Sequence, residues 1–231
     1  MKLQKETTHE KQAHGRWYGD ACGTAFAMEV LGERWALLIV RELMLGARRF
    51  SDIRANLPGI SAKVLTERLA SLEQAGVLAR RELPPPGKAQ VYELTEWGYA
   101  AEPLIQELGR WAAQSSGHDP LLPLSAVSLM LSMRTMLDKR NVGSVKGRIG
   151  FAIGGETFVA EPDHGRLPIR RSALDDVDAV FRAPAATVVA AGLYADVPWE
   201  DLERDAGLVI EGNRMLAMRY AALFSLPPKL A

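Results

Sequence analysis

The fold of this 231-residue chain is decided by residues 46–94, which read GARRFSDIRANLPGISAKVLTERLASLEQAGVLARRELPPPGKAQVYEL. Ser51 and Ser61 are suited to cap two successive helices, because a serine oxygen accepts a hydrogen bond from the free amides of the first turn. The second helix carries one apolar stripe and ends at Gly76. The leucines of that stripe, at i, i+4 and i+7, are Leu65, Leu69 and Leu72.

The pattern changes from helix to strand after this second helix. Residues 77–83 and 90–94 predict two strands, and the proline-rich stretch 84–88 between them predicts an exposed hairpin tip. Residues 22–43 also have a helical pattern, with glycines that end each run. Three helices followed by a two-stranded hairpin is the order of a winged helix-turn-helix, which is a DNA-binding module.

The helix after Ser61 carries short or polar side chains on the face opposite its leucines. A recognition helix places such side chains at base edges in the major groove, whereas the alternative is a solvated helix face. Between residues 46 and 90 eight basic residues outnumber four acidic ones, although the whole chain has 28 of each sign. A local positive excess favours contact with phosphates. The candidate DNA-binding residues are Arg48, Arg49, Ser61, Ala62, Lys63, Thr66, Glu67, Arg68 and Lys88.

Ordered motifs in this region are similar to those of a known family. They are VLGERW at 30–35, LMLGARRFSDI at 43–53, LPGIS at 57–61, LTERL at 65–69, LEQAGV at 72–77 and YELT at 92–95. Together they resemble the HxlR family of bacterial transcription regulators over about residues 20–112. The resemblance implies a homodimer on an inverted-repeat operator, with the first helix and the segment after the wing forming the two-fold contact.

Two residues bear on these implied roles. Pro103 lies in the segment after the wing, at 95–111, where it predicts a kink or a late helix start. Cys22 lies where many members of the resembling family carry a cysteine, which in some acts as a redox or electrophile sensor. Because Cys22 opens a helix, we expect a lowered thiol pKa, which Asp20 opposes. Cys22 is therefore a candidate redox sensor, and the alternative is an inert, partly buried cysteine.

Composition excludes several classes of protein. With 48% hydrophobic and 24% charged residues the chain is not disordered, and a single cysteine excludes a disulfide-built scaffold. Residues 1–19 are polar, and no apolar run reaches the roughly 18–20 residues of a membrane span, so we expect a cytoplasmic protein. We expect no metal, no cofactor and no enzymatic activity, because no Cys/His set has metal spacing and no nucleophile is paired with a base.

The composition changes again at 115–122, which contains serine, glycine and proline and is typical of a linker. We therefore expect a flexible arm over 1–19, the winged helix-turn-helix over 20–114, and a second domain over 123–231. Helical and strand patterns mix in this second domain, so the predicted fold class is α+β. The acidic stretch 175–178 is typical of a solvated helix start.

Soft apolar side chains are prominent in the second domain. Methionine adapts to irregular partners, so these side chains are candidates to line a pocket for a small apolar ligand. The alternative is an ordinary hydrophobic core. The candidate pocket residues are Met130, Met133, Phe151, Phe158, Phe181, Met215 and Met218.

A second, looser resemblance covers roughly residues 123–226. The motifs FRAPAAT at 181–187 and DAGLVIEGN at 205–213, with Gly192 and the pair at 223–224, resemble a sterol carrier protein type 2 domain. That fold is a five-stranded sheet with helices around an apolar tunnel, and lipid transfer does not follow from it. The sequence thus predicts a transcription regulator that binds double-stranded DNA as a homodimer and responds to a small hydrophobic effector. The alternatives are a second domain that only mediates assembly or partner docking, and a lipid-binding carrier.

Overall fold

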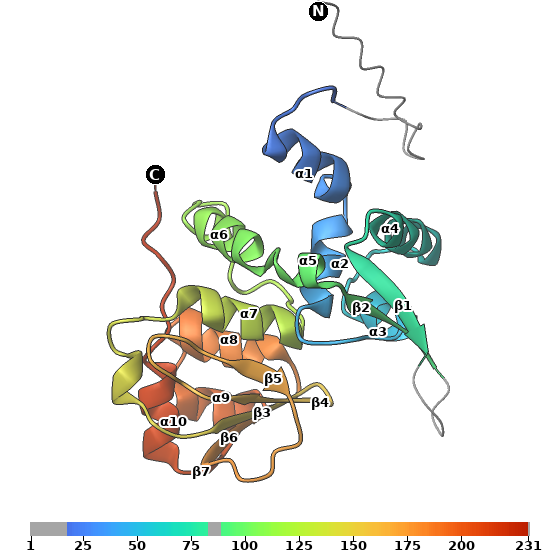
Figure 1. The fold of residues 1–231 in the computed structure, drawn as a ribbon. Coiled ribbons are helices and arrows are strands. Elements are labelled where there is room, and N and C mark those ends of the chain that lie inside the picture. Colours follow the sequence, from blue (N-terminus) through green and yellow to red (C-terminus); the bar gives the residue numbers. More distant parts are fainter. Residues whose placement is uncertain (1–17, 83–88, 231) are drawn as a thin grey trace, which may run out of the picture.

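The computed structural model describes residues 18–82 and 89–230 (Figure 1). The predicted arm over 1–19 therefore lies outside the described residues except for Tyr18 and Gly19, and so does the whole predicted hairpin tip over 84–88, which includes Lys88. In the described part the chain forms a helical domain with a hairpin, followed by a five-stranded sheet with helices. It is a mixed α+β chain.

The N-terminal domain is built from helices and one hairpin. Its elements are α1 (Gly23–Leu31), α2 (Ala36–Leu43), α3 (Phe50–Ala55), α4 (Ala62–Gln74), β1 (Leu78–Glu82), β2 (Gln90–Leu94), α5 (Glu96–Tyr99) and α6 (Glu102–Ala113). The apolar faces of α2, α3 and α4 meet in one core, in which Ile39, Ile53 and Leu65 are fully buried. Burying each such side chain stabilises the fold by about 1.5–3 kcal/mol. The predicted order of helices followed by a hairpin is confirmed. The predicted cap at Ser51 is wrong, because Ser51 lies inside α3, whose N-cap is Arg49.

The hairpin and the following helices settle two details of the N-terminal domain. β1 and β2 pair antiparallel, from Leu78 opposite Leu94 to Glu82 opposite Gln90. The predicted single helix after the wing is divided into α5 and α6, and Pro103 lies in the first turn of α6. Of the two expectations for this proline, the late start is confirmed, since a first-turn proline needs no amide partner.

The C-terminal part extends from α7 to α10. Its elements are α7 (Ala126–Met136), η1 (Val142–Ser144), β3 (Ile149–Ile153), β4 (Glu156–Ala160), β5 (Ile169–Arg171), β6 (Ala179–Ala183), α8 (Ala186–Tyr194), α9 (Trp199–Asp205), β7 (Val209–Gly212) and α10 (Arg214–Ala221). The sheet order is β5-β4-β3-β6-β7. β3 and β6 run parallel at its centre, and the other neighbours pair antiparallel.

Two expectations for the C-terminal part differ from the structure. The central strand β6 occupies a stretch for which the sequence predicted no strand. Residues 175–178 form turns and a bend instead of a helix start, and Asp176 has φ +53°. The side chain of Asp178 accepts a hydrogen bond from the amide of Arg148 at 2.7 Å, so this segment connects to the start of β3.

Aromatic side chains fill the space between the sheet and its helices. The rings of Phe151 and Phe181 stack with centroids 5.5 Å apart, and Phe181 also lies 5.5 Å from the ring of Trp199. Tyr220 of α10 contacts Phe151 and is 1% exposed. These residues form a close-packed core, as folded interiors generally do.

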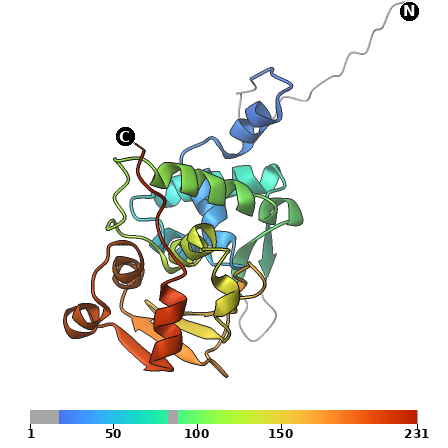
Figure 2. The same ribbon diagram turned by 90° about the vertical axis from the view of Figure 1, so that its left-hand side faces the viewer.

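Helix α7 lies between the N-terminal domain and the sheet (Figure 1). Arg134 of α7 forms an ion pair with Glu102 of α6 at 2.8 Å. The last described residues also lie against α6, where Lys229 Nζ donates to the carbonyl oxygens of Ala113, Ser115 and His118 at 2.9–3.1 Å (Figure 2). The two parts of the chain are therefore held together by polar contacts at both ends of α6. Within residues 18–82 and 89–230, no helix is both long and apolar enough to cross a bilayer.

Candidate nucleic-acid interface

Helix α4 presents the candidate recognition surface. The Ser61 side chain accepts a hydrogen bond from the amide of Val64 at 3.2 Å, so the first turn is capped as expected. The three leucines of the stripe are 0–2% exposed. On the opposite face Lys63, Thr66 and Glu67 are exposed, together with Ala62. The Thr66 hydroxyl donates to the carbonyl oxygen of Ala62 at 2.9 Å, which leaves the hydroxyl oxygen free to accept.

The other candidate DNA-binding residues lie in different surroundings. Arg49 is exposed at the N-cap of α3. The Arg68 side chain is only 21% exposed and lies 3.4 Å from Glu33, in the connection between α1 and α2. Lys88 lies outside the described residues. The structure thus places Arg49 and the N-terminal half of α4 at the surface, and it directs Arg68 toward an internal ion pair.

Arg48 is held by the C-terminal part. Its Nη1 and Nη2 donate to the two carboxylate oxygens of Glu156 at 2.7 and 3.1 Å, and the Arg48 side chain is 11% exposed. Arg171 and Asn56 donate to the same carboxylate. Burial opposes ionisation of Glu156, but the hydrogen bonds from Arg48 and Arg171 outweigh it, so the pKa of this carboxyl lies below its ordinary value.

A second carboxylate lies at the same boundary, and this one is fully buried. Glu42 of α2 is 0% exposed, and its Oε1 accepts from the Arg41 guanidinium at 3.0 Å and from the Ser125 hydroxyl at 2.7 Å. Ser125 also caps α7, so the start of α7 is anchored to α2. Sequence reasoning missed Glu42, Glu156 and Arg171. The partners of the two glutamates in the other part of the chain are up to 108 residues away, so no local sequence pattern indicates these contacts.

Exposed apolar side chains gather on α1, α5 and α6. On α6 they are Leu104, Leu108 and Trp111, at i, i+4 and i+7, with 43%, 42% and 72% exposed. Phe26 of α1 stacks on Trp97 of α5 with ring centroids 6.4 Å apart. These two rings and their neighbours line a groove of about 330 Å³. A continuous patch of exposed apolar side chains is typical of an interaction surface.

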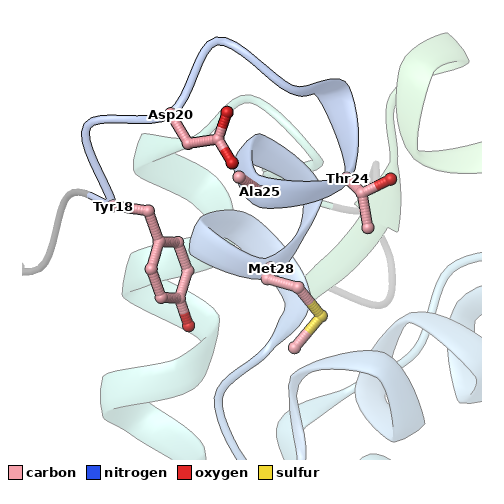
Figure 3. Close-up of a pocket in the computed structure, with 5 residues that line it drawn as sticks. All are labelled: Tyr18, Asp20, Thr24, Ala25 and Met28. Carbon is pink, nitrogen blue, oxygen red and sulfur yellow. The ribbon is translucent and has the colours of Figure 1, made fainter.

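Cys22 opens α1 beside a shallow hollow of about 270 Å³. Figure 3 shows the residues that line the hollow, which are Tyr18, Asp20, Thr24, Ala25 and Met28. The backbone amides of Thr24 and Ala25 lower the pKa of the Cys22 thiol, since they favour the thiolate. Cys22 is exposed rather than partly buried, and its own amide donates to Asp20 at 2.9 Å.

The candidate pocket residues of the C-terminal part are mostly packed against one another. Five of them are at most 1% exposed and belong to the core, namely Met130, Met133, Phe151, Phe158 and Phe181. Met218 is half-buried beside this core. Met215 is 74% exposed in the first turn of α10, so the structure places it outside that packing.

Comparison with known proteins matches the N-terminal half of the chain. Residues 30–119 match the family described as HxlR-like helix-turn-helix. The HTH-type transcriptional regulator YvaP of Bacillus subtilis is 42% identical over 88 residues, which are 38% of this chain and 82% of YvaP. The regulator YodB of the same organism is 43% identical over 38% of this chain and 79% of its own length.

A solved structure of one of these relatives is also similar to part of this chain. The reduced form of YodB is 40% identical and covers 42% of this chain and 98% of its own, with a TM-score of 0.39. These relatives are named as transcriptional regulators. Because this chain covers about four fifths of such relatives at more than 40% identity, it belongs to the family of HxlR-like helix-turn-helix transcription regulators, whose common module binds DNA.

Proposed function

We propose that this chain represses or activates transcription by binding inverted-repeat operator DNA as a homodimer, with α4 in the major groove. The observation that carries the proposal is the capped, exposed N-terminal half of α4, where Lys63, Thr66 and Glu67 lie opposite a buried leucine stripe. A recognition helix reads base edges with the residues at its start. Arg49, exposed at the start of α3, is placed to contact a phosphate.

Dimerisation is supported by the apolar surface of α1 and α6. The three exposed α6 residues form a stripe that water would otherwise cover, and the groove beside Phe26 continues it. A two-fold axis through these helices would bring two copies of α4 to successive major grooves, about one helical turn apart. The operator would then be an inverted repeat, because it mirrors the symmetry of the protein.

Genomic footprinting with the purified chain tests the proposal, and two variants of α4 sharpen it. We expect Thr66→Ala to reduce discrimination between the footprinted operator and random DNA by about 1–3 kcal/mol, as for a lost base contact.

We expect Lys63→Ala to weaken binding to both DNAs alike and to lower the salt slope by about 1, as for a lost phosphate contact. Both are measured by fluorescence anisotropy over a salt series.

The matched control is Gln74→Ala, because Gln74 is exposed on the same helix but at its far end. It should bind like the unchanged protein. Equal losses on operator and random DNA for Thr66→Ala would remove Thr66 from base reading. Failure of the unchanged protein to prefer any inverted repeat would remove the proposal itself.

The proposal includes a small apolar effector in the C-terminal part. Its support is the core of this part, in which Met130 and Met133 are buried together with Phe151 and Phe181, and against which Met218 packs. Methionine side chains move aside more readily than branched ones, so a ligand can enter by displacing them. The competing role is that the C-terminal part only mediates assembly or partner docking. Within the chain, polar contacts hold α7 and the last described residues against α6.

A ligand panel separates these two roles of the C-terminal part. We expect an apolar compound present at about 100 times its Kd to stabilise the protein by about 2.7 kcal/mol, seen as a raised Tm. The compound should also change operator affinity, since an effector must bind the two states of the protein unequally. Native mass spectrometry with a broad panel that finds only the empty protein would leave the assembly role.

A further inference from the structure

The strongest unassigned feature is the hairpin that carries Glu156 to the N-terminal domain. β3 and β4 are joined by Gly154 and Gly155, which have φ +56° and +86°. Two successive residues with positive φ make the tight two-residue turn whose twist suits a hairpin. Glu156 is the first residue after this turn, so its carboxylate lies at the hairpin tip and its position is set by the rigid sheet behind it.

The Glu156 carboxylate collects donors from both parts of the chain. From the N-terminal domain, Arg48 binds it with both terminal nitrogens and Asn56 Nδ2 donates at 3.2 Å. From the neighbouring strand β5, Arg171 donates to it while lying over the ring of Phe158. The fork of an arginine fits a carboxylate and a phosphate with the same two parallel hydrogen bonds. Glu156 therefore fills the position on Arg48 that a phosphate oxygen pair would take.

Arg48 lies beside the surface to which the proposed function assigns DNA. It lies immediately before exposed Arg49, which is the N-cap of α3, the helix that precedes α4 in the chain. The backbone of Arg48 is fixed by two hydrogen bonds to Tyr92 of β2, at 2.9 and 2.8 Å, so only its side chain can redirect the charge. With both terminal nitrogens on Glu156, that charge is withheld from the DNA surface.

Not every polar atom around the Glu156 carboxylate has a hydrogen-bond partner. Two guanidinium groups share one carboxylate, and burial lowers the pKa of Arg171. In the described part of the chain, Nε of Arg48 and both Nε and Nη2 of Arg171 are buried without a hydrogen-bond partner. Unpaired buried donors cost free energy, so the bound arrangement is weaker than its short contacts suggest.

We propose that the Glu156 carboxylate competes with a DNA phosphate for Arg48, so that the hairpin of the C-terminal part lowers the DNA affinity of the winged helix. This inference rests on the proposed DNA-binding function. It gives the C-terminal part a direct electrostatic route to the DNA-binding domain. Any event that shifts the β3–β4 hairpin would change how strongly Arg48 is held.

Four variants of the full chain test the competition. Glu156→Gln keeps the side-chain shape and removes its charge, and we expect it to bind both operator and random DNA about 3- to 10-fold tighter, as for one gained phosphate contact. The salt slope should steepen by about 0.9. Arg48→Ala alone should change DNA affinity less than about twofold, since this arginine is already withheld, but it should abolish the gain in the Glu156→Gln background.

The matched control is Glu161→Gln at the other end of β4. Glu161 also accepts from two arginines, Arg148 and Arg170, and its loss changes the net charge by the same amount, but it has no contact with Arg48. It should leave Arg48-dependent binding unchanged. If Glu156→Gln proves poorly folded by circular dichroism, Glu156→Asp serves instead, because it keeps the charge and shortens the reach, and a smaller gain is expected.

The outcomes separate this inference from the proposed function. If the unchanged protein prefers an inverted repeat but Glu156→Gln and Glu156→Asp bind no tighter, the competition is excluded while the function stands. If Arg48→Ala alone weakens binding as much as in the Glu156→Gln background, Arg48 reaches phosphate despite Glu156 and the inference fails. If none of the proteins binds any DNA, both fail.

Discussion

Replacing Leu108 by aspartate is expected to convert the proposed dimer into a monomer at micromolar concentration and to lower operator affinity at least about 100-fold. Leu108 lies at the centre of the exposed α6 stripe, between Leu104 and Trp111. In a two-fold contact each copy would bury the other's aspartate in apolar surroundings, and an unpaired buried charge is costly. The protein would then bind one half-site at a time. It would lose the gain in affinity, on the order of 10²- to 10⁴-fold, that comes from linking two DNA-binding modules.

Analytical ultracentrifugation and anisotropy measure the two expected effects of Leu108→Asp. The matched control is Met215→Asp, because Met215 is 74% exposed and belongs to α10, a helix of the C-terminal part that lies away from α6 (Figure 1). Aspartate in the first turn of a helix is well tolerated. A Leu108→Asp protein that stays dimeric would rule out this face of α6 as the two-fold contact, even if the DNA-binding helix is correctly assigned.

Local sequence patterns were enough for the N-terminal domain. The leucine stripe of α4, its serine cap and the glycine at its end each act within a few residues of one another, so periodicity reveals them directly. The position of α6 needed one further argument, since Pro103 left two possibilities open that only the observed helix start resolves. Once the leucine stripe had defined the buried face of α4, the side chains on the opposite face could be predicted to be exposed.

The C-terminal sheet was harder to predict because its centre depends on distant pairing. Strand β6, residues 179–183, is only five residues long and pairs in parallel with β3, about 30 positions earlier in the chain. Parallel neighbours are joined by long connections, and no turn signal links them. The hairpin of β3 and β4 is the opposite case, because a two-glycine turn joins its strands and their pairing is local.

The contacts between the two parts could not be predicted from sequence at all. By residue type and by its place in the sequence, Arg48 is a candidate for contact with a phosphate. Nothing near it in the chain indicates that its guanidinium will bind the Glu156 carboxylate. Met215 illustrates the same limit, since it resembles its buried neighbours by type but lies on the surface. Residue type defines what a side chain can do, and only the tertiary arrangement decides which partner it meets.

Truncation of Phe181 to alanine is expected to lower the free energy of unfolding of the C-terminal part by about 3–5 kcal/mol, a large share of the stability of an ordinary domain. Phe181 is 1% exposed, stacks on Phe151 and contacts Trp199 from the next layer. A close-packed core relaxes only partly around such a loss, so the cost includes the empty space left behind. Hydrogen exchange of the amides in β3 and β6 measures it locally.

The size of this effect also distinguishes a packed core from a preformed tunnel. Phe181→Leu, which keeps most of the apolar volume, should cost much less than Phe181→Ala if the core is filled. If Phe181 instead borders a standing tunnel, both variants should cost little, since its ring would already lack neighbours on one side. The alanine variant offers a positive test as well: a small aromatic compound that fits the new cavity should restore part of the lost protection, because apolar cavities of this kind stay dry and bind such compounds.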